Sequence, residues 1–142
     1  ITEYLSAKKA QAYTAIQPKD LIITSDTTVW VDDESLEKAE NREEAYEMIK
    51  KLSGKTHSVY TSVTIRSIEK EVTFSDETQV TFADLSDEEI YFYIDNYKPF
   101  DKAGAYGVQE WIGYIGVDNM NGSYFNVMGL PTHKLYKELI KF

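Results

Sequence analysis

The stretch LIITSDTTVWV, residues 21–31, is apolar at both ends and carries a carboxylate at its centre. Its apolar ends are typical of a buried strand, but Asp26 and its hydroxyl-bearing neighbours interrupt the pattern. A buried carboxylate without a partner is costly enough to change its own protonation state. We therefore expect that Asp26 has partners, that the strand breaks there, or that the residue faces a functional site.

Helix and strand signals alternate along the rest of the chain. Helices, each with a cap or a stop signal, are predicted over residues 2–15, from Asn41 to Gly54, from Ser86 to Pro99 and after Pro131. Strands are predicted over residues 21–31, 57–68, 71–74 and 78–83, the last two as one strand or two, whereas residues 118–122, DNMNG, are typical of a turn. This alternation predicts an α/β domain whose sheet is flanked by helices. Because the strands between residues 57 and 82 are close in sequence, we expect antiparallel pairing there and therefore a mixed sheet.

The composition limits the classes of partner. The chain of 142 residues is long enough for one domain with a real core, and its 42% apolar and 27% charged residues are ordinary for a soluble globular protein. Its formal net charge of −9 argues against a duplex nucleic acid partner, but a cation could bridge a small anionic substrate to it. No apolar run has the length of a membrane span, so no membrane partner is expected. The absence of cysteine excludes disulfides and thiolate metal sites.

Several residues resemble parts of known functional sites, but the spacing and the neighbouring elements favour structural roles for them. The segment SGKT, residues 53–56, resembles the end of a phosphate-binding P-loop, but Ile49 stands where that motif needs glycine. A helix also precedes it and a strand follows, so we interpret it as a helix C-cap. His57 and His133 lack metal-ligand spacing and are expected to be structural or at the surface. Most of the 11 tyrosines, including Tyr97 on the inner face of its helix, are expected in the core or at its rim.

A second unusual stretch is DKAGAYGVQEW, residues 101–111. Its glycines would let the backbone come close to a ligand. Asp101 and Lys102 could serve a site for phosphate and metal, and the amide of Gln109 could read a base edge as donor and acceptor. The alternative is a polar loop with an exposed ion pair.

Four segments, SDTTVW, LSGKTHSVYTSV, DKAGAYGVQ and GSYFNVMGLP, occur in the order and spacing of the Maf family, which the chain resembles over essentially its whole length. The resemblance implies the fold of the inosine triphosphate pyrophosphatases. It also implies hydrolysis of nucleoside triphosphates to the monophosphate and pyrophosphate with a divalent metal, Mg²⁺ or Mn²⁺. The DKAGAYGVQ segment is similar to the branch acting on dTTP and UTP, with modified nucleotides as further candidate substrates. A homodimer in the cytoplasm is implied as well.

The same resemblance assigns roles to individual residues. Asp26 matches the aspartate that acts as general base close to the metal. The positions matched on the substrate side are Thr27 and Gln109 for the base, Lys9 and Lys38 for the phosphates, and Asp101 and Lys102 in the DKAG loop. Metal, substrate phosphates or a lysine would stabilise the charge of Asp26. The alternative is a bulge at Asp26, capped by its serine and threonine neighbours.

The chain departs from the family pattern in two places. Glu37 and Ala39 flank Lys38, where the family usually has glycine and proline. The family also opens with a strand and a Ser-Pro-Arg-Arg type loop, and we expect residues 1–142 to form a single Maf-like domain without that segment. Two hypotheses remain. One is a dTTP/UTP pyrophosphatase, with the activity of this chain left open, and the other is a non-catalytic interaction protein related to inhibition of septum formation.

Overall fold

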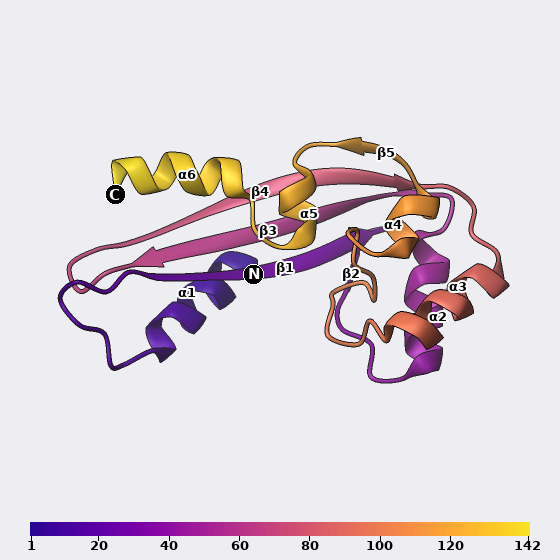
Figure 1. Ribbon diagram of the computed structural model, residues 1–142, viewed down its shortest axis with the longest axis horizontal. Helices are drawn as coiled ribbons and strands as arrows, with labels where there is room; N and C mark the ends of the chain where they lie inside the picture. Colours follow the sequence, from indigo (N-terminus) through magenta and orange to yellow (C-terminus); the bar gives the residue numbers. More distant parts are fainter.

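A five-stranded sheet runs through the computed structural model, which describes residues 1–142 (Figure 1). In order across the sheet, the strands are β2 (Glu34–Leu36), β1 (Ile22–Val31), β3 (Thr56–Arg66), β4 (Glu71–Phe82) and β5 (Val117–Asn121). The predicted α/β class is confirmed, because helices flank this sheet.

The prediction of a mixed sheet is wrong, because every neighbouring pair of strands is antiparallel. β1 turns directly into β2 through Asp32 and Asp33, both with left-handed φ angles (51° and 60°). The chain then enters β3 at the end where β1 finished, since Trp30 pairs with Ser58 and Ile22 with Arg66. A parallel pair would have needed a connection that travels back along the sheet.

Six helices accompany the sheet, namely α1 (Thr2–Ala12), α2 (Arg42–Leu52), α3 (Asp87–Tyr97), α4 (Trp111–Gly116), α5 (Tyr124–Met128) and α6 (Thr132–Lys141). In Figure 1, α1 lies below the long strands and α6 above them, while α2, α3 and α4 gather at one end. None of these helices has the length and apolar character needed to cross a bilayer.

The helix ends follow the capping signals in the sequence. The side chain of Asn41 accepts a hydrogen bond of 2.9 Å from the backbone N–H of Glu44, and Ser86 forms a complete capping box with Glu89. After α2, Gly54 adopts a φ of 69°, which residues other than glycine adopt only rarely. The interpretation of residues 53–56 as a helix end followed by a strand is therefore confirmed.

The main core lies between the sheet, α2, α3 and the 103–112 segment. It contains 18 buried apolar residues, among them Ile49 and Leu52 of α2 and Ile90, Tyr93 and Ile94 of α3. Tyr97, predicted to face inward, is 40% exposed and stacks on Tyr93 with ring centroids 5.2 Å apart. It therefore lies at the rim of this core.

The two faces of β3 are covered by different helices, because neighbouring residues of a strand point to opposite sides. Val63 and Ile65 form a second small cluster with Leu135 of α6. On the other face, hydroxyl groups join α1 to the strand: Thr2 Oγ1 lies 2.6 Å from Ser62 Oγ, and Ser6 Oγ lies 2.9 Å from Thr64 Oγ1. Helix α1 is thus attached to the sheet by hydrogen bonds.

Local signals were weakest in the segments that depend on distant partners. Residues 71–82 form one strand, and the segment read as a turn at 118–122 contains most of β5. That strand exists because residues 117–121 pair with β4, with Val80 opposite Met120. The first helix ends at Ala12 and is shorter than predicted.

Candidate active site

A cleft of about 590 Å³ opens beside β1, between α1, α5, the segment after β2 and the 101–109 loop. All the site residues expected from the sequence line this one cleft: Lys9, Asp26, Thr27, Lys38, Asp101, Lys102 and Gln109. Ser25, Asp26 and Thr27 line it as consecutive residues of one strand. Consecutive strand residues point to opposite faces, so the cleft reaches both faces and lies at the edge of β1. Over Ile22–Thr28 that edge has no partner, because β2 pairs only with Val29–Val31.

Asp26 has a partner and faces the cleft, which answers the question raised by the sequence. The Nζ atom of Lys9 donates hydrogen bonds to Asp26 Oδ1 at 2.8 Å and to the carbonyl oxygen of Ser25 at 3.0 Å. The side chain of Asp26 is 18% exposed, so solvent or a ligand can still reach the carboxylate. The alternative of a bulge at Asp26 is wrong, because the pairing of β1 with β3 runs without a shift from Ile22 to Trp30.

Lys38 and Lys102 lie on two loops that both line the cleft and contact each other. Lys38 and Ala103 form an isolated antiparallel bridge, and the N–H of Gly104 donates to the carbonyl oxygen of Glu37 at 3.2 Å. Lys102 Nζ donates to Asp101 Oδ1 at 3.1 Å, and this hydrogen bond lowers the pKa of Asp101 below its usual value. Asp101 and Lys102 therefore form the ion pair of the polar-loop interpretation and also line the cleft, so both interpretations of this loop apply.

Thr27 and Gln109, the two residues expected to contact the nucleobase, differ in the hydrogen-bonding groups that they leave unpaired. Thr27 Oγ1 is already paired with Thr61 Oγ1 at 2.9 Å. The Oε1 atom of Gln109 is buried and has no hydrogen-bond partner. Because the large majority of buried side-chain polar atoms are hydrogen-bonded, this acceptor is unusual. Gln109 lines the cleft, and a rotation of its amide group would turn this acceptor towards a ligand there.

Several lining residues were not expected from the sequence. The apolar ones include Leu5, Val29, Val59, Val127 and Met128, which offer a surface against which a flat ring can pack. Glu37 and Glu40 also line the cleft and add negative charge beside Lys38. Of these, Val29, Val59, Val127 and Met128 carried a signal, because each lies within one of the four segments shared with the Maf family.

His57 lies at the start of β3 and is buried, with 2% of its surface exposed. Burial lowers its pKa to about 4, so its imidazole is neutral at pH 7. Its Nε2 atom lies 2.6 Å from the hydroxyl oxygen of Tyr106, a cleft residue. The expectation that the histidines are structural or at the surface is confirmed, because His57 is buried in the core and His133 is exposed on α6.

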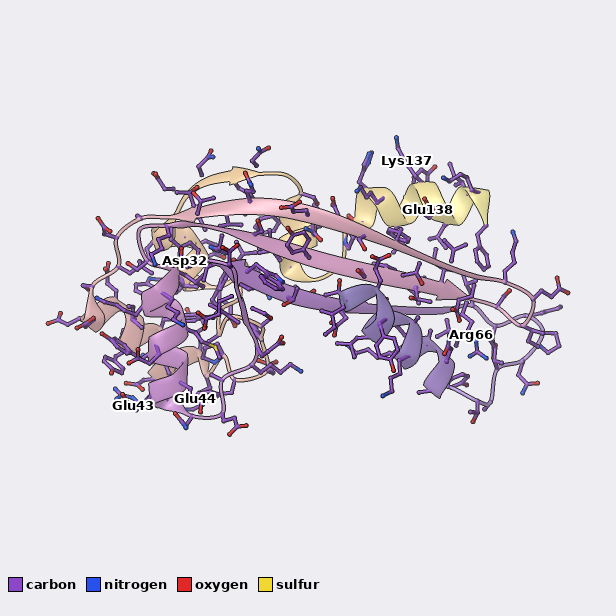
Figure 2. The ribbon with its side chains drawn as sticks, turned by 180° about the vertical axis from the view of Figure 1, so that it is seen from behind. Asp32, Glu43, Glu44, Arg66, Lys137 and Glu138 are labelled. Carbon is purple, nitrogen blue, oxygen red and sulfur yellow. The ribbon has the colours of Figure 1, made fainter.

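Neither arginine of the chain lines the cleft. Arg42 Nε and Nη2 donate to the two carboxylate oxygens of Asp95 at 2.7 and 3.0 Å. Arg66 Nη1 donates to the carbonyl oxygens of Ala10 and Tyr13 at the end of α1. Figure 2 shows Arg66 at the end of the molecule opposite to Glu43, the residue that follows Arg42. Lysines therefore supply the positive charge of the cleft.

The cleft fits a divalent metal only if the substrate helps to hold it. No three histidine, aspartate or glutamate residues come together in a way that could hold a metal ion. Mg²⁺, however, is usually bound through one or two protein carboxylates together with substrate phosphates and water. Asp26 supplies one such carboxylate, since it lines the cleft and its side chain is partly exposed.

The chain is similar to several proteins named dTTP/UTP pyrophosphatase. It is 55% identical over 142 residues to one from Bacteroides thetaiotaomicron, covering 99% of this chain and 74% of that protein. It is 52% identical over 141 residues to one from Flavobacterium psychrophilum, covering 99% and 72%. For one from Porphyromonas gingivalis the identity is 51% over 142 residues, covering 98% and 71%. The family described as Maf-like protein matches residues 1–142, and with the cleft formed by the motif residues this places the chain in the Maf family.

Proposed function

We propose that this protein hydrolyses dTTP and UTP to the nucleoside monophosphate and pyrophosphate. One observation carries the proposal: an aspartate, three lysines and a glutamine with an unused acceptor line a single cleft. The names of the relatives, all dTTP/UTP pyrophosphatases, support the same substrates.

The charges of the cleft suggest how a triphosphate lies in it. Lys9, Lys38 and Lys102 offer positive charge, which a triphosphate requires in a chain with a net charge of −9. Gln109, on the same loop as Lys102, also lines the cleft with an amide that can donate and accept, and both thymine and uracil carry an N–H between two carbonyl groups. We place the phosphates at the lysines and the pyrimidine at Gln109.

Asp26 is the residue we propose as general base. Its carboxylate accepts a proton from a water molecule while the water oxygen attacks the α-phosphorus. The bond between the α-phosphorus and the bridging oxygen breaks, and pyrophosphate leaves with the electron pair of that bond. Lys9 holds the carboxylate in place and meets the negative charge of the phosphates. A divalent ion held by Asp26 and the substrate would polarise the phosphate oxygens and offset their charge.

We further propose that the protein acts in the cytoplasm on free nucleotides and as a homodimer, without a nucleic acid partner. The net charge of −9 disfavours a phosphate backbone as partner. For the dimer, Tyr124, Phe125 and Met128 of α5 offer exposed apolar surface next to the cleft. No observation favours the alternative of a non-catalytic protein related to septum formation.

The test is an assay of pyrophosphate release from dTTP, UTP, 7-methyl-GTP, ATP and GTP with Mg²⁺ or Mn²⁺. We expect dTTP and UTP to be the best substrates, with equal amounts of monophosphate and pyrophosphate as products. Excess EDTA should abolish the reaction, because without the metal only three lysines of the cleft would offset the charge of the triphosphate and polarise its oxygens. Release of orthophosphate, or similar rates for all five nucleotides, would refute the proposal.

A further inference from the structure

Two buried tyrosine hydroxyls hold the loop that carries Lys102 and Gln109. Tyr106 lies within this loop, is 5% exposed, and its hydroxyl oxygen lies 2.6 Å from His57 Nε2. On the far side, the hydroxyl of Tyr93 accepts from the N–H of Gly107 at 2.9 Å. The loop is thus joined to β3 by one hydroxyl and to α3 by the other.

The backbone of the loop needs such support. Gly104 and Ala105 are consecutive and both left-handed, with φ angles of 70° and 61°. A left-handed alanine is uncommon, and such residues persist only when the surrounding structure holds them. Tyr106 follows Ala105 directly, so its hydrogen bond to His57 acts at the point where the backbone leaves this conformation.

Lys102 depends on the same segment for its position. A Cβ atom added to Gly107 would lie 2.8 Å from Cε of Lys102, so the lysine side chain packs directly on the Gly107 backbone. Gln109 follows two residues later, and the neighbouring Glu110 accepts a 2.5 Å hydrogen bond from Tyr93. A displacement of Gly107 would therefore move both Lys102, on the phosphate side of the cleft, and Gln109, on the nucleobase side.

His57 is a costly residue at its position. Its Nδ1 atom is buried without a hydrogen-bond partner, which is destabilising. Phe82 packs against the rings of both His57 and Tyr106, with centroids 5.0 and 4.9 Å apart. An apolar side chain would fill this space without an unpaired nitrogen. What the imidazole adds is its bond to the Tyr106 hydroxyl.

We propose that His57 and Tyr106 are a positioning pair, which sets the spacing between Lys102 and Gln109 and thereby substrate affinity and base preference. The proposal rests on the pyrophosphatase function proposed above. Neither residue takes part in the bond cleavage itself. His57 acts only through Tyr106, because it is not among the residues that line the cleft.

The test compares Tyr106→Phe, His57→Leu and the double variant, in the full chain, with dTTP and GTP as substrates. Each single variant should raise KM for dTTP about tenfold, the scale of one buried hydrogen bond, and leave kcat within about twofold. The preference for dTTP over GTP should fall. Because both substitutions remove the same bond, the double variant should be no worse than the more affected single variant.

Matched controls separate positioning from general destabilisation. Tyr114→Phe and His133→Leu make the same chemical changes at exposed positions and should leave KM unchanged. His57→Gln keeps a polar group that can reach the Tyr106 hydroxyl, so it should recover most of the affinity lost in His57→Leu. Unchanged KM and base preference in Tyr106→Phe, with only a lower Tm, would overturn the proposal, as would a large loss of kcat at constant KM.

Hydrogen exchange of the 103–109 amides, measured without nucleotide, tests the pair independently of catalysis. We expect these amides to exchange faster in Tyr106→Phe than in Tyr114→Phe, while those of β3 stay protected. Equal exchange in the two variants would overturn the proposal. An inactive wild-type protein would instead refute the pyrophosphatase function and the kinetic claim that rests on it, and exchange would still decide whether the pair holds the loop.

Discussion

The ammonium group of Lys9 lies 2.8 Å from one carboxylate oxygen of Asp26, so a helix residue and a strand residue that both line the cleft form an ion pair there. The same ammonium group also donates to the carbonyl oxygen of Ser25. A triphosphate entering the cleft would bring further oxygen acceptors to this cation. The pair therefore links the proposed general base to the proposed phosphate site.

Replacing Asp26 by asparagine should remove the general base and leave the fold intact. The change keeps the shape of the side chain, and loss of general-base catalysis alone lowers rates by roughly 10²–10⁴-fold. We expect kcat for dTTP to fall by at least that much, with an unchanged circular dichroism spectrum. Asp33→Asn, the same change in the exposed turn before β2, is the matched control. If Asp26→Asn retained more than about a tenth of the wild-type kcat, Asp26 would not be the base.

Replacing Lys9 by glutamine should weaken substrate binding. A hydrogen bond to a charged group contributes about 1.5–3 kcal/mol, which corresponds to roughly a 10- to 100-fold rise in KM. Lys8→Gln is the matched control, since Lys8 lies next to it in α1 and lies outside the cleft. Steady-state kinetics with dTTP would measure the difference. Equal KM values for the two variants would place Lys9 outside the phosphate site.

Replacing Gln109 by alanine should reduce the preference for pyrimidine over purine nucleotides. The variant has no side-chain amide to pair with the pyrimidine edge, so the ratio of kcat/KM for dTTP over purine triphosphates should shift by roughly 1–3 kcal/mol. Gln79→Ala changes an exposed glutamine of β4 and should leave the ratio as it is. A uniform loss of rate on all nucleotides would mean that Gln109 has a structural or catalytic role.

His57 should make the protein less stable as the pH falls. Its pKa is about 4 in the folded protein against 6.5 for an exposed histidine, because burial disfavours the charged form. The unfolded chain therefore takes up a proton first, and stability present above pH 6.5 is lost as the pH falls towards 4. The shift corresponds to roughly 3 kcal/mol in the free energy of unfolding.

Urea unfolding at pH 7.0 and 4.5 would measure this loss. The wild-type protein should lose more stability over that range than His57→Leu, which has no imidazole to protonate. His133→Leu, at an exposed position, should behave like the wild type. The same pH dependence in all three proteins would show that carboxylates alone cause it.

Much of the fold could be predicted because its signals are local. Asn41 and Ser86 begin helices through hydrogen bonds to residues three places on, and Gly54 ends a helix through its own φ angle. The site residues were identified through motif resemblance, and the structure brings them into one cleft although the sequence separates Lys9 from Gln109 by most of the chain. Their roles remain predictions.

The parts that could not be predicted depend on distant contacts. β5 forms because β4 lies beside it, and nothing within residues 118–122 indicates that neighbour. The direction of β3 depends on where the chain leaves α2. The spacing of apolar residues carries no information about that position. His57 and Tyr106 lie 49 positions apart, and neither residue alone indicates that the two would meet.

The hydroxyl contacts of α1 decide where the Lys9 ammonium group comes to rest. Thr2 and Ser6 each meet a hydroxyl of β3, and those hydroxyls continue to Ser75 and Thr73 of β4, with oxygen pairs 2.7 and 2.9 Å apart. A helix that packs on a sheet only through apolar side chains can shift or rotate a little. A helix held by a row of paired hydroxyl groups fits in one position, because hydrogen bonds need defined distances and angles. One step along the helix turns each side chain by about 100°, which would break both contacts at once. The position of the Lys9 ammonium group beside Asp26 is therefore set from outside the cleft, by six small side chains, none of which lines it.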